Sequence, residues 1–146
     1  MEIQICPMAE VHLSQVLEIE KSSFPVPFSE NLFQMELRLS VAHMYVGVGG
    51  ERVVGYFDFW HIGPEIHLIN IAVHPDCRHQ GVGGQFIRFM IDYAKGHEVK
   101  EIYLDVRESN AVAIHLYERF GFKAVAVRDA YYEDNKENAL VMELRL

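Results

Sequence analysis

Four residues with an anion-binding pattern stand close together near the middle of the chain. Arg78, His79, Gly81 and Gly83 follow an apolar stretch that ends at a Pro-Asp turn. Glycine can adopt a positive φ and lets the backbone come close to a ligand. Free backbone N–H groups at the start of the helix expected next, with basic side chains beside them, would bind a phosphate or a pyrophosphate.

The spacing of this segment differs from that of two common phosphate loops. A Walker loop ends in Gly-Lys-Ser/Thr, whereas this chain continues with Gly83, Gly84 and Gln85. The third glycine of a dinucleotide-binding fingerprint would fall on Phe86. The remaining pattern is compatible with an anion site. It is also compatible with a strand-to-helix turn in which the glycines only allow tight packing.

A proton acceptor and a proton donor lie farther along the chain. Asp105 belongs to a predicted strand, on the face that alternation gives to Tyr103 and Arg107. Tyr117 lies on the helix predicted next, beyond Asn110. A carboxylate can accept a proton from an attacking group, and a phenol with a pKa of about 10 can protonate a leaving group. The structural alternatives are a salt bridge between Asp105 and Arg107, a strand-end cap, and packing of Tyr117 in the core.

Hydrophobic periodicity predicts the elements that hold these residues. Helices are expected at 9–20, 29–39, 85–94 and 111–120, and strands at 43–48, 53–60, 65–73, 101–106, 125–132 and 139–146. The first helix has one apolar face, marked by Ala9, Leu13, Val16, Leu17 and Glu20. Short links between consecutive strands favour antiparallel neighbours. The expected fold is therefore α/β, with a mixed, largely antiparallel central sheet and helices on both faces.

Both chemistry-bearing segments resemble the GNAT superfamily of N-acetyltransferases. The pattern from Arg78 to Gly83 is similar to the acetyl-CoA pyrophosphate loop of that superfamily. Residues 109–122, which contain Asn110, Tyr117 and a Gly-Phe pair, are similar to its second hallmark segment. Further segments resemble one branch of the superfamily, the ribosomal-protein alanine N-acetyltransferases (RimI type), and they occur in the order found in that branch. These segments are residues 24–29, 69–73, 128–132 and 139–142.

The resemblance implies an acetyl-CoA-dependent enzyme with the GNAT fold, and it implies roles for particular residues. Asp105 occupies the position of the family's general base, and Tyr117 that of its proton donor. Residues expected to bind acetyl-CoA are Ile71, Ala72, Val73, Arg78, His79, Gln80, Gly81, Val82, Gly83, Gly84 and Asn110. Residues expected to contact the acceptor are Glu65, Tyr131 and Tyr132.

Two positions depart from the family pattern. Asp105 stands where the family usually has glutamate, and Phe28 stands where tryptophan is common. Because aspartate is one methylene shorter, we expect Asp105 to act through a water molecule or to share its task with Glu65 or His67. Direct transfer of the acetyl group is preferred over an acyl-enzyme, because the cysteine nearest to the site, Cys77, lies in the pyrophosphate loop.

Length, composition and cysteine content agree with one compact domain. The chain has 146 residues, half of them apolar, so a single acetyltransferase domain spanning 1–146 is expected. No apolar run reaches the ~18 residues that a membrane span needs, and no signal peptide is visible. Cys6 and Cys77 form neither a disulfide framework nor a metal-binding spacing, and no metal is expected. These features favour a cytoplasmic protein.

The net charge favours a basic partner. A formal charge of −8, from 21 acidic and 13 basic residues, disfavours direct binding to nucleic acid and attracts basic substrates, although it also serves solubility. In the family fold, several acidic residues belong to segments near the acceptor groove. They are Glu30, Glu36, Glu65, Asp129, Glu133, Asp134 and Glu137.

The expected function is therefore acetylation of a protein amine, in particular the N-terminal alanine of a small-subunit ribosomal protein. A monomer or weak homodimer without membrane attachment is expected. One alternative is a GNAT enzyme that acetylates lysine side chains or a small amine. Another is a non-catalytic acyl-CoA-binding sensor, but the joint presence of Asp105, Asn110 and Tyr117 favours the enzyme.

Overall fold

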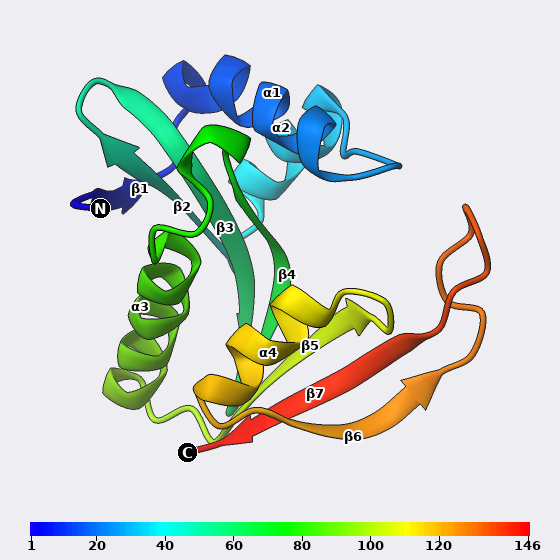
Figure 1. Cartoon of the computed structure of the whole chain (residues 1–146). Helices are drawn as coiled ribbons and strands as arrows, with labels where there is room; N and C mark the ends of the chain where they lie inside the picture. Colours follow the sequence, from blue (N-terminus) through cyan, green and yellow to red (C-terminus); the bar gives the residue numbers. More distant parts are fainter.

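The computed structural model describes residues 1–146 and contains one seven-stranded sheet in the order β1-β2-β3-β4-β5-β7-β6 (Figure 1). The strands are β1 (Gln4–Pro7), β2 (Ala42–Gly49), β3 (Arg52–Ile62), β4 (Glu65–Val73), β5 (Glu101–Arg107), β6 (Lys123–Arg128) and β7 (Ala139–Arg145). The helices are α1 (Leu13–Ser23), α2 (Glu30–Arg38), α3 (Val82–Gly96) and α4 (Ala111–Arg119), with 3-10 turns at Glu10–His12 and Pro75–Cys77. Only β4 and β5 pair in parallel.

Helices cover both faces of this sheet, as predicted. Helices α1 and α2 pack on one face, where Val16 and Phe33 are buried in a cluster with Tyr56 of β3. Helices α3 and α4 pack on the other face, where Phe86 and Tyr117 belong to a second buried cluster. The predicted fold class is confirmed. None of the helices combines the length and the hydropathy that a membrane span requires.

Strands β4 and β5 run side by side over a short stretch and then diverge. The paired residues are Glu65–Leu68 of β4 and Glu101–Leu104 of β5. A register shift between β3 and β4 leaves Ile69 without a direct partner. Such a bulge bends a strand, and here it coincides with the point of separation. From Ile69 to Val73, β4 therefore has a hydrogen-bonded neighbour on one side only (Figure 1).

Some element boundaries differ from the sequence-based expectation. Periodicity misses β1, because four residues at a sheet edge are too few for an alternation signal. Helix α3 begins at Val82 rather than at about Gln85. Strand β6 ends at Arg128 rather than continuing to Tyr132, because Ala130 has a φ of +49° and turns the chain.

Candidate functional site

The glycine-rich loop ends in an exposed helix N-terminus. Gly81, the residue before α3, has a φ of +81°, and His79 has a φ of +62°. The backbone N–H groups of Val82, Gly83 and Gly84 have no acceptor within the protein, as is usual in the first turn of a helix. These groups and the positive end of the helix dipole fit an anion such as the pyrophosphate of acetyl-CoA.

The second glycine of the pattern does not use the conformational freedom that glycine allows. Gly83 lies inside α3 and has no positive φ. A Cβ atom built on Gly83 would lie 3.3 Å from Cδ2 of Leu116. Gly83 therefore allows α3 to approach α4 closely, and Gly81 supplies the left-handed turn.

Arg78 connects the loop to two other elements. Its Nε donates to the backbone oxygen of Val73, at the end of β4, over 3.1 Å. Its Nη2 donates to Oγ of Ser23, at the end of α1, over 3.2 Å. The guanidinium is thus held beside the unpaired edge of β4, and its Nη1 group remains available to an anion.

A hollow of about 340 Å³ opens beside the separation of β4 and β5. Its lining residues are Glu65, His67, Leu68, Ile69, Tyr103, Leu104, Asp105, Arg128 and Val141. Nε2 of His67 lies 3.0 Å from Oε2 of Glu65, and the His67 ring stacks on that of Tyr103 with centroids 5.4 Å apart. The hollow therefore brings Asp105 together with the two residues that are predicted to share its task.

Asp105 is paired with an arginine other than the predicted one. Its Oδ1 accepts from Nε of Arg128 over 3.1 Å, so the alternative of a salt bridge to Arg107 is wrong. The side chains of Asp105 and Arg128 are 31% and 55% exposed. Because water screens such a pair, it contributes little to stability, and Arg128 can leave Asp105 at small cost.

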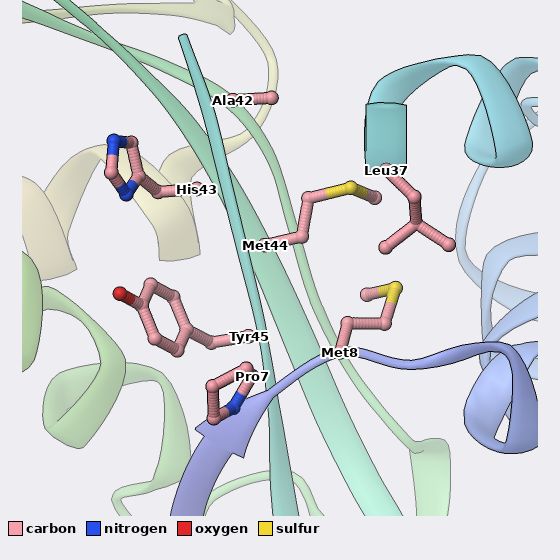
Figure 2. A pocket seen from close by; sticks show the side chains of 7 residues that line it. All are labelled: Pro7, Met8, Leu37, Ala42, His43, Met44 and Tyr45. Atoms are coloured by element: carbon pink, nitrogen blue, oxygen red, sulfur yellow. The ribbon is translucent and has the colours of Figure 1, made fainter. Parts of the chain in front are cut away.

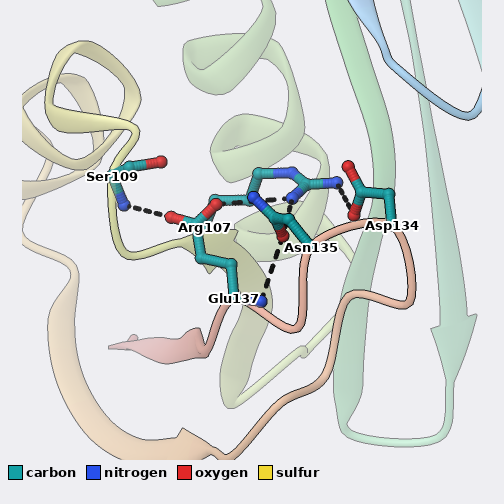
Figure 3. Close-up of polar contacts among 5 residues, drawn as sticks. All are labelled: Arg107, Ser109, Asp134, Asn135 and Glu137. Atoms are coloured by element: carbon teal, nitrogen blue, oxygen red, sulfur yellow. Dashed lines mark hydrogen bonds and ion pairs between the residues drawn. The ribbon is translucent and has the colours of Figure 1, made fainter.

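Arg107 instead organises the connection between β6 and β7 (Figure 3). Its Nη2 lies 3.0 Å from Oδ1 of Asp134, and its Nη1 lies 3.3 Å from Oε1 of Glu137. Oε2 of Glu137 accepts from the backbone N–H of Ser109 over 2.7 Å, and these bonds lower the pKa of Glu137. The guanidinium carbon of Arg107 also lies 3.9 Å from the centroid of the Tyr132 ring. Arg107 thereby fixes this connection against β5.

The two tyrosines predicted to contact the acceptor lie in this connection. Tyr131 is 48% exposed, and its ring meets that of Tyr132 edge-on with centroids 5.2 Å apart. The guanidinium of Arg128, which lines the hollow, lies 5.7 Å from the Tyr131 ring. Burial raises the pKa of Tyr132 to about 12, so its hydroxyl stays protonated. Both tyrosines thus lie next to the hollow that contains Glu65 and Asp105.

Helix α4 carries the predicted proton donor on the opposite face of the sheet. Asn110 caps the helix, with its Oδ1 accepting from the backbone N–H of Ala113 over 3.2 Å. Tyr117 is 5% exposed and belongs to the cluster under α3 and α4. Burial, and then the neighbouring Tyr132, raise the pKa of Tyr117 above its ordinary value, so the phenol keeps its proton. Asp105 and Tyr117 lie on opposite faces of β5, beside its separation from β4.

Some of the acidic charge expected near the acceptor is buried or neutralised. Glu36 is 7% exposed and accepts from Nε1 of Trp60 over 3.0 Å, so its charge is withdrawn from the surface. Asp134 and Glu137 are paired with Arg107. The predicted acidic residues that are exposed and form no ion pair are Glu30, Asp129 and Glu133.

A second hollow, of about 210 Å³, lies where β2 extends beyond β1 (Figure 2). Its lining residues are Pro7, Met8, Leu37, Ala42, His43, Met44 and Tyr45. Figure 2 shows Met8, Met44 and Leu37 on one side of β2, and His43 and Tyr45 on the other. This mainly apolar hollow lacks the carboxylates Glu65 and Asp105 that line the hollow beside β5.

Two residues near the site escape the sequence analysis. Arg128 belongs to β6, which β7 separates from β5 in the sheet, and its side chain reaches Asp105 across β7. This pairing depends on the order of the strands, which the sequence does not show. Glu20 is 1% exposed and accepts hydrogen bonds from three residues. The only sequence signal for Glu20 is a charged side chain on the apolar face of a predicted helix.

Comparison with known proteins gives consistent similarities. Residues 13–122 match the model of the acetyltransferase (GNAT) family. A Bacillus subtilis (strain 168) protein, provisionally named as a ribosomal protein bS18-alanine N-acetyltransferase, is 34% identical over 131 residues, which is 89% of this chain and 87% of that protein. The ribosomal protein bS18-alanine N-acetyltransferase of Escherichia coli (strain K12) is 31% identical over 142 residues, which is 96% of this chain and 95% of that protein.

Solved structures agree with these sequence matches. The crystal structure of the ribosomal-protein-S18-alanine N-acetyltransferase from Escherichia coli superposes with a TM-score of 0.91 at 29% identity, over 99% of this chain and 94% of that chain. Ard1 from Thermoplasma volcanium superposes with a TM-score of 0.92 at 22% identity, over 100% of this chain and 99% of that chain, and shows the shared fold.

Proposed function

Because this chain belongs to the acetyltransferase (GNAT) family and is an N-acetyltransferase, we propose that it acetylates the N-terminal alanine of a small-subunit ribosomal protein. The observation that carries the proposal is the opening between β4 and β5, with Asp105 and Tyr117 on opposite faces of β5. An amine from the hollow and a thioester from the loop side would meet there. Two relatives named for acetylation of bS18 support the choice of acceptor.

Acetyl-CoA is the co-substrate in this proposal, bound by residues 71–73, 78–84 and Asn110. The free N–H groups after Gly81 and the guanidinium of Arg78 bind the pyrophosphate. The unpaired edge of β4 offers backbone N–H groups to the pantetheine arm and the acetyl group. Donors fixed in advance at the acetyl oxygen stabilise the negative charge that develops there during attack.

Proton transfer is divided between the two faces of β5. The acceptor amine, with a pKa of about 8 for an α-amino group, must be neutral when its nitrogen attacks the thioester carbon. Asp105 accepts the amine proton, directly or through water, and the Glu65–His67 pair shares the task. As the carbon–sulfur bond breaks, the sulfur takes the electron pair and receives the proton of the Tyr117 hydroxyl.

The acceptor lies in the hollow lined by residues of β4, β5, β6 and β7. Glu65, Tyr131 and Tyr132 border this hollow and contact the acceptor chain. The unpaired acidic side chains Glu30, Asp129 and Glu133 attract a basic N-terminus. The same proposal includes a single domain over residues 1–146, a cytoplasmic location, a monomer or weak homodimer, and no binding to nucleic acid, membrane or metal.

A thiol-release assay over three classes of acceptor tests the proposal. The acceptors are basic peptides that begin with alanine, the same peptides with a blocked N-terminus and one lysine, and a polyamine. We expect rapid release of CoA only with the free alanine N-terminus. Faster turnover with the lysine peptide or the polyamine would favour the other GNAT activities. Binding of acetyl-CoA without release of thiol in any mixture would favour the sensor.

A further inference from the structure

Arg128 forms an ion pair with the residue that is proposed to accept the amine proton. Its Nε donates to Oδ1 of Asp105 over 3.1 Å, and Arg128 pairs with no other carboxylate. The second carboxylate oxygen of Asp105, Oδ2, accepts no hydrogen bond from the protein. Asp105 can therefore accept a proton through Oδ2 while its Oδ1 stays bonded to Arg128.

Both members of this pair line the hollow assigned to the acceptor. Arg128 is the last residue of β6, and its guanidinium carbon lies 5.7 Å from the centroid of the Tyr131 ring. A cation over the face of an aromatic ring is attracted to it, so the guanidinium is held by both Asp105 and Tyr131. The positive charge of Arg128 thus belongs to the surface that an acceptor amine meets when it enters the hollow.

The groups that can carry charge around this hollow come from four strands and the β6–β7 connection. Its lining contains Glu65, His67, Tyr103, Asp105 and Arg128. Groups that lie next to the lining are Glu101, Tyr131, Tyr132 and two ion-paired sets, Arg107 with Asp134 and Glu137, and Arg145 with Glu143. Arg128 is the only lysine or arginine in the lining, where two carboxylates stand beside it.

An acceptor amine enters this hollow mainly as an ammonium ion. An α-amino group has a pKa of about 8, so most of it is protonated at pH 7. A carboxylate within about 4–6 Å favours the charged form further. The ammonium nitrogen has no lone pair and cannot attack a thioester, so an ion pair with Asp105 would strengthen binding of the unreactive form. Binding energy of this kind lowers KM without raising kcat.

We propose that Arg128 prevents Asp105 from holding the acceptor as its unreactive ammonium ion, an inference that rests on the proposed function. Arg128 is a positioning residue in this role, because it acts through Asp105. Its guanidinium offsets the negative charge of Asp105, so the bound amine loses its proton more readily. Because an arginine side chain is not deprotonated in proteins, this charge is present over the whole pH range in which the amine titrates.

Arg128→Met tests this role, because methionine keeps a flexible, unbranched side chain but carries no charge. We expect kcat and the KM of an alanine peptide to fall together by about fivefold at pH 7, with kcat/KM and the KM of acetyl-CoA unchanged. The pH at which kcat reaches half its maximum should rise by about 0.7, because the bound amine keeps its proton to a higher pH. The differences from wild type should shrink towards pH 9.5, where the amine is mostly neutral in both proteins.

Two further variants show whether the charge itself is responsible. Arg128→Lys should keep kcat and peptide KM within about twofold of wild type, because Arg128 makes a single bond to Asp105 and lysine supplies the same charge. Lys123→Met is the matched control, since it removes a cation from the same strand outside the lining of the hollow. The Arg128 side chain is 55% exposed, so its replacement should not prevent folding. If Arg128→Met does not fold, Arg128→Gln replaces it.

Calorimetry with CoA in place of acetyl-CoA gives a second measurement, without turnover. An alanine peptide should bind Arg128→Met about fivefold more tightly than wild type at pH 7. The same peptide with an acetylated N-terminus has no ammonium group and should bind both proteins equally. A difference that persists with the acetylated peptide would mean that Arg128 acts on the peptide chain rather than on the ammonium ion, and would overturn the inference.

The kinetic outcomes separate this inference from the proposed function. An active wild type whose Arg128→Met variant keeps or raises its peptide KM overturns the role of Arg128, because a structural role or a direct contact with the acceptor predicts those results. A wild type that releases no thiol with alanine peptides overturns the proposed acceptor, and this inference with it.

Discussion

The anion loop is one continuous stretch, residues 78–84, whereas the acceptor side is assembled from segments far apart in the chain. The loop uses mostly backbone N–H groups, and its shape depends on a left-handed Gly81. The proposed acceptor side uses side chains of β4, β5, β6 and β7, with the β6–β7 connection beside them. Its geometry depends on the ion pairs of Arg107 and Arg128.

This difference predicts how each side responds to mutation. A backbone site is disturbed by changes of conformation, and few side-chain changes within it should affect binding. A site made by side chains from several elements can be disturbed by a distant mutation, since each segment is positioned by its own hydrogen bonds or ion pairs. Changes on the loop should therefore act on acetyl-CoA alone, and changes on the acceptor side on the peptide alone. Only the groups that move protons, or that act through them, should affect kcat.

Tyr117→Phe should have the largest effect. It removes one hydroxyl and keeps the ring, so packing in the core persists. General acid catalysis typically contributes at least about 100-fold, and kcat and kcat/KM should fall together by that amount, with acetyl-CoA affinity unchanged. Single-turnover kinetics with saturating peptide measure this. Tyr45→Phe is the control. Normal turnover with reduced stability would make Tyr117 a packing residue.

Asp105→Asn should have the next largest effect. It removes a proton acceptor but leaves the Glu65–His67 pair in the same hollow, so we expect kcat to fall about tenfold at pH 7. Because an α-amino group with a pKa of about 8 loses its proton as pH rises, the variant should recover part of its activity towards pH 9. A pH profile of kcat measures both effects, with the exposed Asp92→Asn as control. A profile identical to that of wild type would contradict the role of Asp105.

Gly81→Val tests the loop side alone. The φ of +81° strains any residue with a Cβ atom, although no heavy atom lies within 4 Å of the added carbon. We expect acetyl-CoA affinity to fall about tenfold, or about 1.4 kcal/mol, with peptide KM unchanged. Calorimetry measures the affinity. Gly50→Val introduces the same strain at a φ of +66° in an open turn, and equal affinity losses in both variants would contradict the assignment of the loop.

Arg107→Lys should have the smallest effect. Lysine has a single ammonium group and cannot bond Asp134 and Glu137 at the same time as the planar guanidinium does. The β6–β7 connection is then held less firmly, and we expect peptide KM to rise about threefold. Because the pKa of Glu137 is lowered, its carboxylate stays ionised and keeps its hydrogen bonds at any pH above the ordinary glutamate pKa. These bonds are lost only as the pH falls below that value. The difference in KM from wild type should therefore be constant from pH 6 to about 8. Arg145→Lys is the control. A change in the KM of acetyl-CoA in Arg107→Lys would contradict the separation between the loop and the acceptor side.

Features that depend on neighbouring residues could be predicted from the sequence. The left-handed Gly81, the caps at Ser29 and Asn110, and the alternation that exposes Asp105 all follow from short stretches of chain. The fold class follows from hydrophobic periodicity and short links. In each case the physical cause lies within one turn or strand.

Features that depend on distant residues could not be predicted. Arg128 reaches Asp105 across an intervening strand, and the register that allows it is fixed only by the complete sheet. Glu20 and Asn70 are fifty positions apart in the sequence. The role of Gly83 also depends on a distant residue, Leu116, because only the packing of α3 on α4 closes the space around it.

The unpaired edge of β4 ties the thermal stability of the protein to its ligand. An unpaired strand edge normally lies at the border of a sheet, where charged side chains or twist discourage other strands from pairing with it. Here the edge lies inside the sheet, between β4 and β5. Acetyl-CoA at about 100 times its Kd would stabilise the native state by about 2.7 kcal/mol. The free enzyme should therefore melt at a lower temperature, and a cell rich in acetyl-CoA would keep more of it folded.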